Sequence, residues 1–271
     1  MPNKVRPVTT HGLRRMKERG QKIVMLTAYD ALFAGLVDRA GVDVVLVGDS
    51  VNTVLCGEET TLSATLEQMI YHARITRRGV ERALVVLDMP FMSYQVSIED
   101  AKRNAGRVLK ESGVHGVKLE GGAATVPTAR ALVEIGIPVM GHLGFTPQSV
   151  HALGGYRVQG RDEGSADKIV ADARALEEAG IFSLVLELMP TDVARRVTES
   201  VTIPTIGIGS GPMCDGQVLV LHDMLGLNEG FEPKFLKRYA ELAEEVRKAV
   251  RSFGEDVRSG RYPDPDHSYE A

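Results

Sequence analysis

Acidic side chains follow several short apolar runs of this 271-residue chain, at the point where each run ends. Asp49 and Asp88 follow two successive runs, and Glu120 and Glu187 follow two later ones. The carboxyl ends of parallel strands meet at one edge of a sheet or barrel, so these four carboxylates would converge. An isolated acid there is commonly a helix cap or an ion-pair partner. Four acids at equivalent points would repel one another unless a cation lay among them.

The donor atoms around these acids favour a hard divalent cation. Oxygen donors dominate, and neither Cys56 nor Cys214 lies in a metal-binding spacing, which favours Mg2+ over Zn2+. Mg2+ keeps several waters and uses one or two carboxylates. We therefore expect Asp49 and Asp88 as direct ligands, with Glu120 bound through a water on the metal.

The elements that must position these acids are eight short apolar runs that alternate with amphipathic stretches. The predicted strands are 23–27, 42–47, 83–87, 116–119, 138–141, 183–186, 204–208 and 218–221, of which the last could equally begin a helix. Most are continuous Val, Ile and Leu runs, as in strands covered on both faces, and the alternation predicts a parallel sheet with helical crossovers. The chain length suits one α/β barrel of roughly 250 residues. We predict a single (β/α)8 TIM-barrel domain over 1–271, with a doubly wound sheet as the alternative.

Helical spacing of apolar residues predicts the connecting elements. The expected crossover helices include 64–78, 100–112 and 166–179. Gly113 and Gly180 suit the position just after a helix. An extra N-terminal helix at 10–19 could close the base of the barrel. Pro233 is placed to open a long C-terminal helix, whose apolar residues recur as far as Phe253.

Composition excludes several classes of protein. A net charge of −4, a pI near 6.0 and the absence of Trp argue against a nucleic-acid partner. No stretch reaches the ~18 apolar residues of a membrane helix, and the N-terminus lacks a signal-peptide core. We expect a cytoplasmic protein that binds no membrane, with both cysteines buried and reduced.

Eight sequence segments occur in an order that is specific to one family. They are TAYD (27–30), LVGDS (46–50), DMPFMSY (88–94), VKLEGG (117–122), GHLGFTPQS (141–149), LGGYRVQGR (153–161), LVLELMP (184–190) and IGIGSGPMCDGQVLVLHD (206–223). Across nearly the whole chain this set resembles the ketopantoate hydroxymethyltransferase (3-methyl-2-oxobutanoate hydroxymethyltransferase) family of pantothenate synthesis. In one departure, Val51 and Asn52 stand where some relatives carry Leu-Gly, which removes no residue that carries chemistry.

The resemblance implies a fold, an assembly and a reaction. The fold is the (β/α)8 barrel, and the assembly is a large homo-oligomer, typically a decamer. The reaction moves a hydroxymethyl group from the co-substrate 5,10-methylenetetrahydrofolate onto 3-methyl-2-oxobutanoate. By motif, it makes Asp49 and Asp88 metal ligands at the substrate site and places Glu120 in the outer metal shell. Ser50 and Lys118 become contacts of the substrate carboxylate.

The same resemblance makes Glu187 the base that removes the substrate's C3 proton, and Mg2+ would stabilise the resulting enolate. Glu187 follows an apolar run, which suits this role. Lys118 lies two residues before Glu120, so both side chains share one face of the strand. Buried there, Lys118 needs an anion, either the substrate carboxylate, which we favour, or a structural acid. His142 could orient Glu187 or the substrate, or be a core histidine bonded to backbone.

Two loops have open interpretations. The Gly-rich stretch 143–164 is long for a barrel connection, which is typical of a lid. Within it, Tyr156 and Arg157 could contact the folate or serve only the loop structure. The GIGSG sequence at 207–211 could bind phosphate, but its glycines are equally required by tight turns, and we favour the turn.

Three other functions are compatible with parts of this residue pattern. Barrels of the phosphoenolpyruvate mutase or isocitrate lyase type also bind Mg2+ and an enolate, but typically need a reactive loop Cys that has no counterpart here. A metal-dependent pyruvate aldolase has a similar ligand set. A non-catalytic scaffold would be expected to lack at least one of the chemistry-bearing residues, and all are present.

Overall fold

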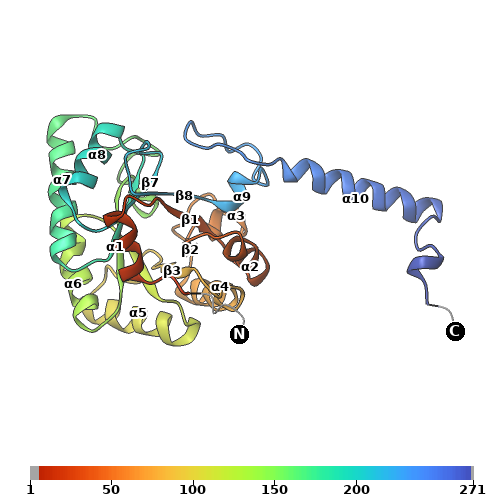
Figure 1. The fold of residues 1–271 in the computed structure, drawn as a ribbon, viewed down its shortest axis with the longest axis horizontal. Coiled ribbons are helices and arrows are strands. Elements are labelled where there is room, and N and C mark those ends of the chain that lie inside the picture. The colour runs from red at the N-terminus through yellow and green to blue at the C-terminus, as the bar shows by residue number, and fades with distance from the viewer. Residues whose placement is uncertain (1–5, 270–271) are drawn as a thin grey trace. The chain divides into compact units, whose positions relative to one another are not determined.

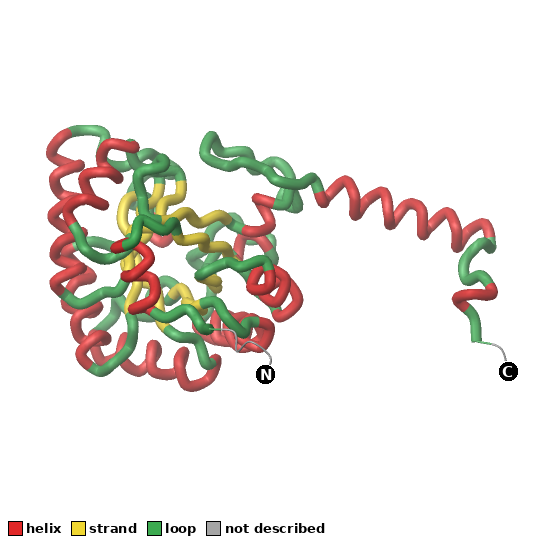
Figure 2. The backbone as a smooth tube through the Cα atoms, viewed as in Figure 1, coloured by secondary structure: helices red, strands yellow, loops and turns green. Residues whose placement is uncertain are grey.

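Eight parallel strands close into a barrel in the computed structural model, which describes residues 6–269. The strands are β1 (Ile23–Thr27), β2 (Val44–Val47), β3 (Leu84–Asp88), β4 (Gly116–Glu120), β5 (Val139–Gly144), β6 (Ser183–Glu187), β7 (Thr205–Ile208) and β8 (Gly216–Leu219). They pair in chain order, and β8 returns to pair with β1. Figure 2 shows the strands inside a ring of helices. The predicted TIM barrel is confirmed, and the doubly wound sheet is wrong.

Helices connect the strands and cover the outside of the barrel (Figure 1). They are α2 (Ala31–Arg39), α3 (Val51–Val54), α4 (Leu66–Gly79), α5 (Ile98–Ser112), α6 (Val126–Glu134), α7 (Glu163–Glu178) and α8 (Thr191–Ser200). Local sequence sets their ends. Thr65 and Gln68 form a capping box at the start of α4, and Ser97 caps α5. Gly113 ends α5 at a φ of 73°, as predicted for a residue after a helix.

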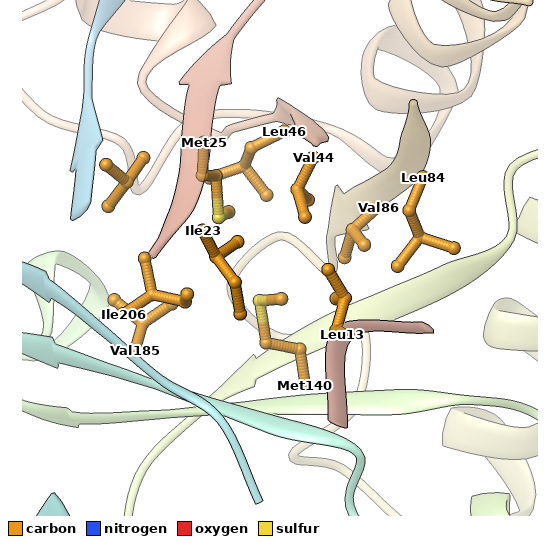
Figure 3. Close-up of a cluster of buried hydrophobic side chains, with 11 residues drawn as sticks. Leu13, Ile23, Met25, Val44, Leu46, Leu84, Val86, Met140, Val185 and Ile206 are labelled. Carbon is orange, nitrogen blue, oxygen red and sulfur yellow. The ribbon is translucent and has the colours of Figure 1, made fainter. Parts of the chain in front are cut away.

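The apolar core fills the barrel interior below the strand ends. It consists of Leu13, Ile23, Met25, Val44, Leu46, Leu84, Val86, Met140, Val185, Ile206 and Val218. Leu13 is fully buried in this cluster although it belongs to α1 (Thr10–Glu18), which precedes the first strand (Figure 3). The predicted N-terminal helix is therefore confirmed, and its apolar residue closes one end of the barrel.

A half-buried lysine fastens α1 to the barrel. Lys17 Nζ donates to the carbonyl oxygens of Thr198, Val201 and Ile203, at 3.0, 3.0 and 2.9 Å. It also lies 3.0 Å from Asp215 Oδ2. These carbonyls lie at and just after the end of α8, where a cation is favourable.

Lys17→Met is expected to lower the free energy of unfolding by about 2–3 kcal/mol, because hydrogen bonds to a charged donor are lost and their acceptors stay behind. Urea denaturation measures this. Arg14→Met on the same helix is the matched control, since Arg14 is exposed and, among residues 6–269, pairs with the exposed Glu18 at 3.6 Å. A loss no larger than the control's would show that Lys17 does not fasten the helix.

Residues 221–271 form a second compact unit. It contains α9 (Leu221–Met224) and the long helix α10 (Leu242–Ser259). The C-terminal helix is confirmed, but its predicted start at Pro233 is wrong. The N–H groups of Tyr239 and Leu242 donate to the carbonyls of Met224 and Leu225, so the chain before Leu242 is bonded back to α9 instead of forming helix. A single domain over 1–271 stays a prediction.

The cysteines differ in exposure. Both are free; Cys214 is buried and Cys56 is exposed. Burial raises the pKa of the Cys214 thiol. The predicted burial is therefore wrong for Cys56, which follows α3 in a surface turn. Across residues 6–269, no helix is long and apolar enough to cross a membrane.

Candidate active site

Strand register brings the predicted residues together at the carboxyl ends of the strands. Asp88 at the end of β3 stands beside Lys118 of β4, and Glu120 of β4 stands beside His142 of β5. Glu187 ends β6 in register with Gly144. The same alternation that points Lys118 and Glu120 to one face directs both into the barrel, where each is nearly fully buried.

Lys118 is the cation of this buried cluster. Its Nζ lies 2.9 Å from Asp88 Oδ1 and 3.8 Å from Glu120 Oε1. Burial opposes its charge, but the carboxylates of Asp88, Glu120 and Asp49 raise the pKa of Lys118 above its ordinary value. The lysine therefore stays protonated and has a structural acid as its partner. A contact with the substrate carboxylate stays a prediction.

His142 links the two glutamates. Its Nδ1 lies 3.2 Å from Glu120 Oε1 and 2.9 Å from Lys118 Nζ, and its Nε2 lies 3.1 Å from Glu187 Oε2. Burial and the Lys118 charge oppose protonation, but the bonds to Glu120 and Glu187 outweigh them and raise the pKa of His142 to about 9. The described contacts are with side chains, so the orienting interpretation fits better than that of a core histidine bonded to backbone.

Asp49 completes the cluster from the end of β2. Its backbone N–H donates to Asp88 Oδ2 at 3.2 Å. Burial, together with the charges of Asp88 and Glu120, raises the pKa of Asp49 to about 8. Next to it, the Ser50 hydroxyl lies 2.8 Å from the hydroxyl of Tyr29.

The donor set fits Mg2+ held by few carboxylates. Burial raises the pKa of Asp88 as well as that of Asp49, so ionisation of these two neighbouring acids is unfavourable in the metal-free cluster despite the charge of Lys118. A divalent cation would relieve this conflict. Within residues 6–269, no group of three or more His, Cys, Asp or Glu side chains is placed to hold a metal. Mg2+ usually binds through one or two carboxylates and keeps several waters, whereas a closed zinc site takes four protein ligands.

Two buried residues in the cluster were missed by the sequence interpretation. Gln148 donates from Nε2 to Asp49 Oδ2 at 3.0 Å, and its backbone N–H donates to Glu120 Oε2 at 3.0 Å. Tyr94 donates from its hydroxyl to Gln148 Oε1 at 2.9 Å. Both lie in the segments DMPFMSY and GHLGFTPQS, which was the available signal, but neither follows a strand directly.

The loop after β5 brings an aromatic ring toward this cluster. Tyr156 is 63% exposed, and its ring stacks on Phe145 with centroids 4.7 Å apart. Burial and the charge of Glu187 raise the pKa of Tyr156. Arg157 is exposed beside it. The folate contacts and the lid role of this loop stay predictions.

The glycines of the GIGSG sequence are explained by the backbone. Gly209 and Gly211 have φ of 64° and 75°, and a Cβ on Gly211 would lie 2.2 Å from Thr191 Oγ1. Glycine is therefore required for the turn whatever it binds. The turn interpretation accounts for the sequence.

Comparison with known proteins decides the family. The sequence profile of ketopantoate hydroxymethyltransferase matches residues 7–265. The 3-methyl-2-oxobutanoate hydroxymethyltransferase of Moorella thermoacetica is 56% identical over 262 residues, which cover 97% of each chain. That of Syntrophus aciditrophicus is 52% identical over 98% of each chain. The chain belongs to the ketopantoate hydroxymethyltransferase family.

Solved structures place this family member's fold among related barrels. 2,3-Dimethylmalate lyase, of the PEP mutase/isocitrate lyase superfamily, aligns with a TM-score of 0.60 at 19% identity, over 95% of this chain and 92% of that chain. Phosphonopyruvate hydrolase in complex with oxalate and Mg2+ aligns with a TM-score of 0.61 at 12% identity, over the same shares. At these identities the likeness shows the fold alone. The family match favours the hydroxymethyltransferase over the mutase, aldolase and scaffold alternatives.

Proposed function

We propose that this chain transfers a hydroxymethyl group from 5,10-methylenetetrahydrofolate to 3-methyl-2-oxobutanoate. The products are 2-dehydropantoate and tetrahydrofolate, and one water is consumed. Membership of the hydroxymethyltransferase family supports the activity. The observation that carries the mechanism is one continuous run of polar contacts, which leads from Asp49 and Asp88 through Lys118, Glu120 and His142 to Glu187.

Asp49 and Asp88 would hold Mg2+, and Glu120 would complete its outer shell. When bound, Mg2+ supplies Lewis-acid stabilisation of negative charge on the substrate's 2-oxo oxygen. Glu120 already accepts from His142 and from the backbone of Gln148. Burial would raise the pKa of Glu120, but the hydrogen bond and charge of His142 lower it below its ordinary value, so this acid stays ionised.

The remaining side chains bind the substrate and move its proton. Ser50 and Lys118 would bind the substrate carboxylate. Glu187 would take the C3 proton, and His142, 3.1 Å from Glu187 Oε2, would hold the carboxylate in its orientation. Water would add to the methylene carbon as its two bonds to the folate nitrogens break, which would leave tetrahydrofolate and the carbon as formaldehyde. The C3 carbon would then bond to that carbonyl carbon, whose oxygen would take up a proton to become the hydroxyl of the hydroxymethyl group.

The C3 proton of 3-methyl-2-oxobutanoate tests this proposal directly. In D2O, with Mg2+ and without folate, its NMR signal is expected to decay, and removal of the metal with EDTA should stop the decay. Addition of 5,10-methylenetetrahydrofolate should then yield 2-dehydropantoate. Absence of exchange both with and without tetrahydrofolate would contradict the proposed substrate. Aldol addition of pyruvate to an aldehyde without folate would favour the aldolase alternative.

Two further expectations stay predictions. The first is a homo-oligomer, typically a decamer, which the resemblance implies; the second is a cytoplasmic location, which was expected from the sequence features alone. Neither is needed for the chemistry proposed here, because Asp49, Asp88, Lys118, His142 and Glu187 all lie in one barrel.

A further inference from the structure

Gln148 makes several hydrogen bonds at the cluster of Asp49, Asp88 and Glu120, yet it has no part in the proposed chemistry. It lies in the 3₁₀ turn Pro147–Ser149 after β5 and is 6% exposed. Its side-chain and backbone atoms contact Asp49 Oδ2, Met89 O, Glu120 Oε2, Tyr94 Oη and Gln95 Nε2. A loop residue with this many buried partners is held in place by the site, or holds the site in place.

The contacts reach two acids that belong to different strands. The side-chain Nε2 donates to Asp49, which follows β2, and the backbone N–H donates to Glu120, which ends β4. Both acids are nearly fully buried, where like charges repel strongly. Donors on a third segment are therefore needed to fix the carboxylate orientations, and Gln148 supplies one to each acid.

The amide orientation of Gln148 is settled by its neighbours. Oε1 faces two donors, the hydroxyl of Tyr94 at 2.9 Å and Nε2 of Gln95 at 3.2 Å. Nε2 faces two acceptors, Asp49 Oδ2 at 3.0 Å and the carbonyl of Met89 at 2.9 Å. A flipped amide would place oxygen against two acceptors. The N–H group must therefore point at Asp49.

Tyr94 connects the amide to Glu120 a second time. Its hydroxyl accepts the backbone N–H of Glu120 at 3.1 Å and is 2% exposed as a residue. Burial and the Glu120 charge raise the pKa of Tyr94, so the hydroxyl keeps its proton as a donor to Gln148. The two residues thus form one hydrogen-bonded unit between the acids.

We propose that Gln148, oriented by Tyr94, is a positioning residue that holds the carboxylates of Asp49 and Glu120 in the arrangement that binds the divalent cation. The proposal rests on the magnesium site of the proposed function. It assigns Gln148 no contact with substrate. Outer partners of metal ligands typically contribute 10–100-fold to metal affinity or activity.

Mn2+ binding, measured by electron paramagnetic resonance on the full chain, tests the proposal without any turnover. Gln148→Met keeps the volume and removes the donors of the side chain, so the Kd for Mn2+ is expected to rise by about 10–100-fold. Exchange of the C3 proton should fall at low Mg2+ and recover to within about threefold at saturating Mg2+. Gln21→Met, the same substitution at an exposed position just before β1 and outside the cluster, should leave the Kd within about threefold of the wild type.

Tyr94→Phe is the second test variant, for use if Gln148→Met does not fold. It should weaken Mn2+ binding by a smaller factor, because Gln95 still faces Oε1, and should add little in the Gln148→Met background. Unchanged Kd values in folded variants, with only a lower urea midpoint, would reduce Gln148 to a structural loop residue. Wild-type protein that binds no Mn2+ would contradict the magnesium site itself, which separates the two failures.

Discussion

Glu187→Gln is expected to slow exchange of the C3 proton of 3-methyl-2-oxobutanoate by about 10²–10⁴-fold, the usual contribution of a positioned general base. The amide fills the same volume but cannot accept the proton. Glu187 lies 3.1 Å from His142 Nε2, so the variant also keeps a hydrogen-bonding group at that position. Exchange is followed by NMR in D2O with saturating Mg2+.

Metal binding separates this effect from general damage to the site. Glu187 lies outside the Asp49–Asp88–Glu120 group, so the Kd for Mn2+ should stay within about threefold in Glu187→Gln. Glu134→Gln at the exposed end of α6 is the matched control and should exchange at the wild-type rate. Wild-type exchange in Glu187→Gln would overturn the base assignment and point to another proton acceptor at the barrel mouth.

Asp88→Asn is expected to destabilise the metal-free protein by about 3–5 kcal/mol, because it removes the closest carboxylate from a buried lysine. Lys118 Nζ lies 2.9 Å from Asp88 Oδ1, whereas the next acid, Glu120, lies 3.8 Å away. The charged side chain is 4% exposed, so water cannot replace the lost partner. Urea denaturation in EDTA measures the loss.

Asp49→Asn is the matched control for this prediction. Burial and the charges of Asp88 and Glu120 raise the pKa of Asp49 to about 8, which disfavours its ionised form in the metal-free protein, and an amide resembles the neutral form. Unlike Asp88, which pairs with Lys118 at 2.9 Å, Asp49 accepts from the neutral amide of Gln148, so Asn at position 49 should cost little stability. Both variants should weaken Mn2+ binding. The double variant Asp88→Asn/Lys118→Met should recover much of the stability lost in Asp88→Asn. If it does not, the unpaired charge of Lys118 is not the cause of that loss.

The sequence by itself determined the strands and the acids at their ends. Continuous Val, Ile and Leu runs are typical of strands covered on both faces in a parallel sheet, and strand ends in such a sheet meet at one edge. Alternation along β4 is enough to place Lys118 and Glu120 on one face of the strand. These features are local in sequence. Spacing alone was therefore enough to predict that Asp49, Asp88 and Glu187 would lie at the same end of the barrel as Lys118 and Glu120.

Only the tertiary structure decided which side chains touch. Register between β3 and β4 pairs Lys118 with Asp88, and sequence spacing carries no information on register between separate strands. Gln148 and Tyr94 lie in loops, where no periodicity indicates direction, yet they hold two acids of the site. The start of α10 at Leu242 was likewise set by bonds to α9 rather than by helical spacing. Contacts between segments distant in the chain form only when the barrel closes, and local patterns cannot specify them.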